Sequence, residues 1–305
     1  MTDDARTPPP LAPRHWPAWL GIGMAALLAR LPWPLQRRLG RAVGGVLMRI
    51  AGARRRVAAR NIALCFPELD QAAQAALLRE SFAELGIGLF EFARAWWGSV
   101  APMRGREVVE GLEHLQAARA GGRGVIIVSG HFVTLELAAR LMCEHAPLAG
   151  MYRPHDGAAM EWAVRRGRLR YASAMFTREE LRPAIRHLKQ GGLLWFGPDQ
   201  DTRRGDSVFV PFFGQQAYSL TSTHQLARLS GAAVMGFAHV RHDDGHYTLR
   251  LTPVFDDFPS ADATTDTARV MREIETMIRA APGQYLWIHR RFKRQPGQPD
   301  NALYR

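Results

Sequence analysis

The feature that most constrains the fold is a short apolar run, "GVIIVSG", at residues 124–130. Its four central residues are all β-branched, and such residues favour extended backbone over helix. A strand that is apolar on both faces has to be covered on both sides, as in a parallel sheet between two layers of helices. The runs "PLAGMYRP" (147–154) and "GGLLWFG" (191–197) have the same character. We therefore expect an α/β fold with a mostly parallel sheet flanked by helices.

Segments with helical periodicity separate these strands, as the alternation of an α/β fold requires. Further strands are predicted at 232–240 and 246–255. Helices are predicted at 70–97, 132–145, 156–170, 181–190, 217–231 and 266–282.

The first 66 residues differ in composition from the rest and predict attachment to a membrane. Residues 1–14 are polar and proline-rich, so we expect a disordered tail there. Residues 15–36 are almost purely apolar and carry tryptophans near both ends, which is typical of a membrane-anchor helix. Residues 37–66 form a basic amphipathic segment, with eight arginines and no acid between 37 and 60, which places this flank on the cytoplasmic side. The alternative is a solvated helix face in a soluble protein. Residues 67–305 are predicted to form the catalytic domain.

The charge balance favours anionic partners. The chain has 40 Lys and Arg against 28 Asp and Glu, a net charge of +12. Such a field attracts nucleic acid, anionic lipid, phosphorylated substrates or acidic proteins, and composition alone does not choose among them. The two cysteines, Cys65 and Cys143, form no CxxC pair, and the chain has no HExxH or P-loop motif. We expect neither a metal nor a cofactor.

Polar clusters follow three of the predicted strands. "SGH" follows the first apolar run, "YRPH" follows the second and "PDQD" follows the third. Sites in open α/β sheets form beyond the carboxyl ends of the strands. His131, Arg153 and Asp199 are therefore expected at one edge of the sheet.

His131 and Glu136 have a spacing that needs an explanation. Positions i and i+5 lie about 140° apart on an ideal helix, so the two side chains would not share a face. They can pair only if His131 precedes the helix or caps it, with the ring folded back. Glu136 would then hold one ring nitrogen and leave the other as a base. The alternative is a histidine that caps the helix, with Glu136 on the solvated face.

These motifs carry a resemblance to a known family. "GHFVTLE" resembles the signature of membrane glycerolipid acyltransferases, a histidine, four spacers and an acidic residue. The segments "NIALCFPEL", "MYRPHDGAAMEWAVRRGRLR", "WFGPDQD", "VPFFG", "LARLSGAA" and "APGQYLWIHRRFKRQP" are similar to those of the lipid A late acyltransferases, the lauroyl- and myristoyltransferases of Gram-negative bacteria. Glu136 and "YRPH" resemble the lauroyl-type branch.

The resemblance implies a glycerolipid-acyltransferase-like domain on the cytoplasmic face of the bacterial inner membrane, held by a single anchor. It implies transfer of a fatty acyl chain from acyl carrier protein to a hydroxyl on an acyl chain of an anionic, Kdo-bearing lipid A precursor, with no part for nucleic acid. By matched motif His131 is the general base and Glu136 its orienter, while Arg168, Asp199 and Arg153 bind substrate. We further predict that Asp199 holds the Arg168 guanidinium.

Two other functions remain open at this point. A lysophospholipid acyltransferase would use the same chemistry, but it usually carries aspartate at position 136 and a downstream E-G-T/S-R-like motif, which this chain lacks. A non-catalytic basic protein of the membrane surface would need no such site.

Overall fold

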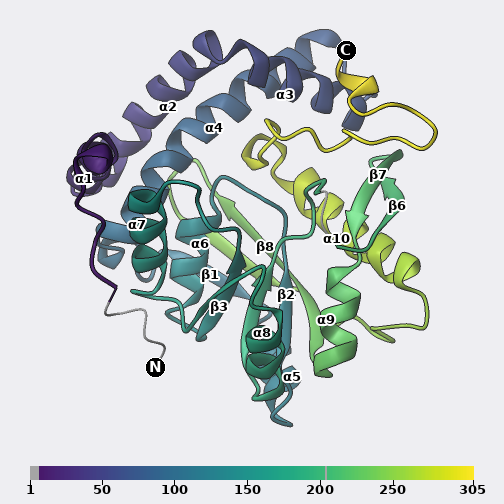
Figure 1. The fold of residues 1–305 in the computed structure, drawn as a ribbon. Coiled ribbons are helices and arrows are strands. Elements are labelled where there is room, and N and C mark those ends of the chain that lie inside the picture. Colours follow the sequence, from purple (N-terminus) through teal and green to yellow (C-terminus); the bar gives the residue numbers. More distant parts are fainter. Residues whose placement is uncertain (1–6, 203–204) are drawn as a thin grey trace.

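A computed structural model describes residues 7–202 and 205–305, and a seven-stranded sheet lies at its centre (Figure 1). The strand order is β1-β9-β8-β2-β5-β3-β4. The strands are β1 (Glu107–Glu110), β2 (Val125–Val128), β3 (Leu148–Tyr152), β4 (Met175–Thr177), β5 (Leu193–Phe196), β8 (Ala233–Arg241) and β9 (Tyr247–Leu251). Within this seven-stranded sheet only the β8–β9 pair is antiparallel, so the prediction of a mostly parallel sheet is confirmed.

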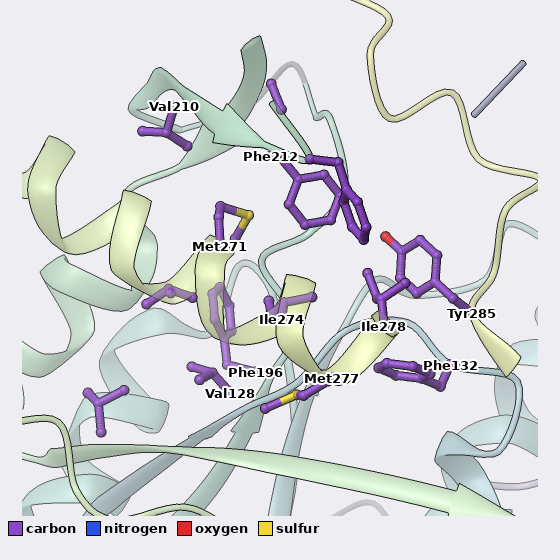
Figure 2. Packing of buried hydrophobic residues seen from close by; sticks show 14 of the residues in the cluster. Val128, Phe132, Phe196, Val210, Phe212, Met271, Ile274, Met277, Ile278 and Tyr285 are labelled. Carbon is purple, nitrogen blue, oxygen red and sulfur yellow. The ribbon is translucent and has the colours of Figure 1, made fainter. Parts of the chain in front are cut away.

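Helices cover both faces of the sheet. They are α5 (Leu112–Arg119), α6 (Leu135–Met142), α7 (Ala158–Arg168), α8 (Leu181–Lys189), α9 (Ser222–Ser230) and α10 (Ala263–Ala280). In β2, Ile126 and Val128 pack in one hydrophobic cluster with α10, while Val125 and Ile127 pack in a second cluster with α6. Figure 2 shows the first cluster, with Val128 beneath side chains of α10. The strand is apolar throughout because both of its faces are buried.

Four helices at the N-terminal end form a further layer, labelled α1 to α4 in Figure 1. They are α1 (Trp16–Leu28), α2 (Trp33–Ile50), α3 (Gly52–Cys65) and α4 (Gln71–Trp97). Glycines let α2 and α4 approach closely, since a Cβ on Gly86 would lie 2.0 Å from the Gly40 carbonyl oxygen. A Cβ on Gly44 would likewise lie 2.1 Å from the Phe82 carbonyl oxygen. This contact fixes α2 on the catalytic domain.

The helix predicted over residues 15–36 is divided in two. α1 ends at Leu28, and α2 begins at Trp33 with Pro32 as its N-cap. Prolines at positions 32 and 34 explain the break, because proline lacks an amide donor and disfavours helical backbone in the residue before it. Within residues 7–202 and 205–305, no helix has the length and apolar character needed to cross a bilayer.

The predicted disordered tail is partly described. Residues 1–6 lie outside the described residues. The indole of Trp162 donates to the Thr7 carbonyl oxygen at 2.9 Å, and that of Trp19 donates to Pro10 at 2.7 Å. Residues 7–14 therefore lie against α1 and α7.

The single helix predicted at 217–231 is wrong in its first part. Residues Ser207–Phe212 and Gln215–Leu220 form an antiparallel hairpin, β6 and β7, and α9 begins only at Ser222. The two residues of the turn, Phe213 and Gly214, both have positive φ (51° and 72°). A two-residue turn of this kind matches the twist of the paired strands, so the hairpin overrides the helical periodicity of the segment that follows.

Candidate active site

Two neighbouring strands bring His131 and Asp199 together. β2 and β5 are paired in parallel up to Val128 and Phe196, and the chain leaves both strands at the same edge. His131 donates its backbone N–H to Asp199 Oδ2 at 2.9 Å, and its ring nitrogen Nδ1 lies 2.5 Å from Asp199 Oδ1. The predicted gathering of these two residues at one edge of the sheet is confirmed.

Asp199 is fully buried, and polar contacts surround its carboxylate. Besides His131, the hydroxyl of Tyr285 donates to Asp199 Oδ2 at 2.8 Å. Burial raises the pKa of Asp199, but the charge and hydrogen bonds of His131 and the Tyr285 hydroxyl lower it by more, so the net pKa lies below its ordinary value. Asp199 is therefore a carboxylate that accepts three hydrogen bonds.

This contact sets the tautomer of His131. With Nδ1–H donated to a carboxylate, the neutral ring carries no proton on Nε2, which is then a base. Burial lowers the pKa of His131, while the Asp199 carboxylate raises it, and the net pKa lies above its ordinary value of 6.5. The ring is 28% exposed, so Nε2 is accessible to a substrate.

Glu136 does not hold His131, contrary to the sequence-based prediction. It lies in the first turn of α6, and its carboxylate accepts hydrogen bonds from Trp96 Nε1 at 2.7 Å and Tyr171 Oη at 2.9 Å. Arg168 donates its Nε–H to Glu136 Oε1 at 2.8 Å and its Nη2 to the same oxygen. The physical reason is the spacing: His131 precedes α6, and the start of the helix directs Glu136 toward α4 and α7.

The predicted pairing of Arg168 with Asp199 is also wrong. Each of the two carboxylates already has a cationic or titratable partner, Glu136 with Arg168 and Asp199 with His131. Burial raises the pKa of Glu136, but the Arg168 charge and the hydrogen bonds lower it to a net value below the ordinary one. The pKa of Arg168 is lowered by burial and raised by more through Glu136. The pair is therefore ionised, with Glu136 buried and the Arg168 side chain largely buried.

A cavity of about 390 Å³ runs from His131 into the domain. Its polar lining includes His131, Glu136 and Arg168. Trp195 also lines the cavity, and its ring makes a T-shaped contact with the His131 ring, with 5.9 Å between the centroids. The remaining walls are mostly apolar and come from α4, the loop before α6, α6 itself, β3 and the start of β4. These residues include Leu85, Leu89, Phe92, Val133, Ala139, Leu148, Ala149, Met151 and Met175. An apolar cavity with a few convergent polar groups is typical of a site for a ligand with a hydrocarbon chain.

Arg153, predicted to bind substrate, lies at the rim of this cavity. Its side chain is 62% exposed and pairs with Asp156 at 3.0 Å. The structure therefore places Arg153 on the wall of the cavity, with its guanidinium held at the surface.

Among the residues that the structure describes, none is an activated nucleophile at this place. Ser129 is fully buried, and its hydroxyl lies 3.4 Å from His239 Nε2. Burial raises the pKa of the Cys143 thiol to about 11, and it also raises that of Cys65. In the described part of the chain, no group of three or more His, Cys, Asp or Glu side chains is placed to hold a metal ion.

Sequence analysis missed three residues of the site: Tyr285, Trp96 and Tyr171. Tyr285 reaches Asp199 from the segment that follows α10, while Trp96 comes from the end of α4. No spacing connects these residues to His131 or Glu136. The only available signal was that Tyr285 lies in "APGQYLWIHRRFKRQP" and Tyr171 directly follows "RRGRLR".

A methyl group on Gly197 is expected to displace the His131 ring. A Cβ at this position would lie 2.9 Å from His131 Cε1 and 2.7 Å from Trp195 Cη2, both closer than side-chain carbons approach. Gly197→Ala should lower kcat about 10- to 100-fold, because a displaced base loses its alignment with the substrate. Gly121→Ala is the matched control, since nothing lies within 4 Å of its Cβ. Equal rates for the two variants in a transfer assay would contradict the placement of His131.

Comparison with known proteins identifies the chain's family. Residues 5–294 match the family described as bacterial lipid A biosynthesis acyltransferase. The Escherichia coli lipid A biosynthesis lauroyltransferase is 40% identical, covering 94% of both chains, and the palmitoleoyltransferase of the same organism is 40% identical, covering 96% of both. The E. coli myristoyltransferase is 29% identical over 94% of this chain and 90% of its own.

Solved structures are similar at a low level. The 1-acyl-sn-glycerophosphate (LPA) acyltransferase of Thermotoga maritima superimposes with a TM-score of 0.38 at 14% identity, covering 83% of this chain and 99% of that one. The likeness is too low to support an argument, whereas the matches in sequence extend over nearly the whole chain. The chain belongs to the bacterial lipid A biosynthesis acyltransferases, the secondary acyltransferases of lipopolysaccharide biosynthesis.

Proposed function

We propose that the protein transfers a fatty acyl chain from acyl carrier protein to a hydroxyl on an acyl chain of a Kdo-bearing lipid A precursor. The observation that carries the proposal is that His131 lines the apolar cavity and is held from behind by the buried Asp199. The cavity takes the acyl chain of the donor, and His131 lies where the chain's thioester would meet an acceptor hydroxyl.

In the proposed mechanism His131 Nε2 removes the proton from the acceptor hydroxyl. The resulting alkoxide attacks the thioester carbonyl carbon and forms a tetrahedral oxyanion. This intermediate collapses, the carbon–sulfur bond breaks, and the leaving thiolate takes the proton from the His131 imidazolium. Asp199 stabilises that imidazolium and keeps the ring oriented.

Arg168 is the proposed donor to the substrate. Glu136 engages its Nε–H and Nη2–H, which leaves Nη1–H for a phosphate or for the oxyanion. The guanidinium packs over the Tyr152 ring at 5.5 Å, so it is held from two sides. Glu136 therefore acts as a positioning residue for Arg168. Arg153 would meet the anionic acceptor at the rim of the cavity.

The test is a transfer assay with purified protein in detergent. The donor is lauroyl-acyl carrier protein, and two acceptors are compared: a Kdo-bearing lipid A precursor and lysophosphatidate. We expect product only from the lipid A precursor. Product from lysophosphatidate alone would overturn the proposal in favour of a phospholipid-forming enzyme, and transfer to neither acceptor would overturn it outright. Donors of other lengths, including palmitoleoyl, then determine the chain preference.

We also propose that α1 and α2 bind the cytoplasmic face of the bacterial inner membrane. Each helix has an exposed apolar stripe at helical spacing, Trp16, Leu20, Met24 and Leu27 on α1 and Leu35, Leu39, Val43, Val46 and Ile50 on α2. The exposed arginines Arg38, Arg41 and Arg49 of α2 would meet anionic headgroups.

Charges in the apolar stripes are expected to release the protein from membranes. The double variant Leu20→Asp, Val43→Asp should shift a large part of the protein to the soluble fraction, because each side chain loses about 2 kcal/mol of apolar burial. The matched control is Leu181→Asp, Leu229→Asp, which changes two exposed leucines outside the stripes. Cofractionation of both variants with membranes to the same extent would contradict the proposal.

The basic segment "HRRFKR" at residues 289–294 is a candidate docking surface for the acidic acyl carrier protein, but only part of it is available. Arg291 is 2% exposed, and its guanidinium donates to Tyr218 O and Ser219 Oγ, so it supports the fold and is not available to a partner. Arg290 is exposed, and its contact is a hydrogen bond to Asn301 Oδ1 at 2.8 Å. We propose Arg290 as part of the surface that meets the acidic acyl carrier protein.

Charge reversal at Arg290 is expected to weaken the binding of acyl carrier protein and not that of a short acyl-CoA donor. Arg290→Glu should raise the KM for acyl carrier protein several-fold, and more at low salt, because steering between charged surfaces is screened by ions. The KM for a short acyl-CoA should not change. Equal effects on the two donors would mean that Arg290 does not contact the carrier.

A further inference from the structure

A second hollow, of about 710 Å³, lies at the junction of α1 and α2. It shares no residue with the cavity at His131. Its walls come from the α1–α2 turn, the end of α4, and the turns before β1 and between β8 and β9. The charged and aromatic residues among them are Arg30, Trp33, Arg37, Arg94, Trp97, Arg106 and Asp244.

The lining has four arginines and a single acid. Asp244 already has partners, since its Oδ1 accepts from the backbone N–H of His246 at 3.1 Å and lies 2.5 Å from the ring Nδ1. Within residues 7–202 and 205–305, the arginines at 30, 37, 94 and 106 form no ion pair with a carboxylate. The hollow therefore carries an excess of positive charge.

Arg94 makes this excess unusual because it is only 3% exposed. Its guanidinium donates to Gln36 Oε1 at 2.8 Å, Ser99 O at 2.8 Å and Leu31 O at 2.7 Å, and all three acceptors are neutral. A buried cation is normally compensated by an anion. A bound anion in the hollow would supply that compensation.

Two buried donors beside the hollow have no hydrogen-bond partner in the described part of the chain. Trp33 is 7% exposed and lines the hollow, and its indole N–H has no hydrogen-bond partner in the described chain. The buried Nε of Arg37 is likewise without a partner among those residues. Indole and guanidinium groups are donors only, so the partner that either one lacks is an acceptor such as an oxygen. A phosphate group has the charge and the oxygens required.

The position of the hollow indicates the source of that phosphate. The apolar stripe of α1 ends at Leu27, and the hollow begins at Ala29 and Arg30. We propose that the hollow binds the phosphate headgroup of an anionic phospholipid whose hydrocarbon chains lie along α1. The inference rests on the proposed membrane attachment of α1 and α2, and it adds a specific lipid site to that surface.

The test is thermal melting of the full chain in a nonionic detergent, with soluble dihexanoyl lipids as ligands. Dihexanoyl phosphatidylglycerol should raise Tm in proportion to its occupancy, whereas dihexanoyl phosphatidylcholine and inorganic phosphate should raise it much less. Arg37→Gln should weaken the apparent Kd for the anionic lipid about tenfold, the effect of one lost charge-assisted hydrogen bond. Arg106→Gln, which changes another arginine of the lining, should do the same and serves if Arg37→Gln folds poorly.

Arg182→Gln is the control, since Arg182 is an exposed arginine on α8 and does not line the hollow. This variant should keep the full shift. Loss of the shift in all three variants alike would indicate diffuse attraction and overturn the site. If inorganic phosphate raised Tm as much as the lipid did, the ligand would not be a lipid headgroup. If no ligand raised Tm, both the anion site and its assignment to a lipid would be wrong. The melt uses neither donor nor acceptor, so its failure is distinct from failure of the transfer assay.

Discussion

Replacing His131 by alanine is expected to lower the rate of acyl transfer about 100- to 10,000-fold, the range that a general base contributes. The thermal melt should change little, because the ring is partly exposed at the cavity and its backbone N–H still donates to Asp199. The measurement is single-turnover transfer from acyl carrier protein, with binding of the donor followed separately. The loss should appear in kcat, with a smaller change in KM.

His114→Ala provides the control for this variant. His114 is a half-exposed histidine on α5 with Glu113 as its neighbour, and it is not part of the cavity. Its removal should leave the rate near normal. If well-folded His131→Ala kept more than about half of the rate, the assignment of His131 as the base would be wrong.

Replacing Asp199 by asparagine is expected to be nearly as damaging, with a loss of about 1,000-fold or more, because an amide can stabilise the wrong tautomer of the His131 ring. The residual activity gives a second readout. Asp199 raises the pKa of His131, and a base is active only when deprotonated, so kcat/KM should rise with pH through that pKa. Removing the carboxylate lowers the pKa of His131. The acid limb of the profile should therefore move to lower pH in Asp199→Asn.

Glu136→Gln separates the two carboxylates. It should leave the acid limb in place, because Glu136 contacts Arg168 and not the His131 ring. It should instead reduce the free energy of unfolding by about 3 kcal/mol, since Arg168 would be left as a buried cation without its counter-ion. The pKa of Glu136 is depressed, so this stabilisation is present above its unfolded pKa and is lost as pH falls. If the acid limb of the kcat/KM profile shifted in Glu136→Gln and stayed in place in Asp199→Asn, Glu136 would be the residue that orients the His131 ring.

Local sequence was sufficient to predict those strands and helices whose own residue pattern is distinctive. The β-branched run at 125–128 is apolar on both faces, and both faces prove to be buried, against α10 and α6. The helix predicted at 70–97 is observed at Gln71–Trp97. The hairpin of β6 and β7 was missed because its turn depends on positive φ at Phe213, which is a poor residue for that conformation. Pro32 and Pro34 indicated a break in the predicted anchor helix. The prediction of one continuous helix gave more weight to the apolar composition of the segment.

The class of the fold, the family, and the placement of His131 and Asp199 at the ends of two buried strands follow from the sequence alone. Which carboxylate meets which cation depends on the tertiary structure. The order β8-β2-β5-β3 places β5 beside β2, although β3 and β4 lie between them in the sequence. Asp199 thereby reaches His131, while Arg168 at the end of α7 reaches Glu136. The spacing of two residues along a chain shows whether they lie on the same helix or strand. It does not show which helices and strands become neighbours, because that depends on the packing of the whole sheet and its helices.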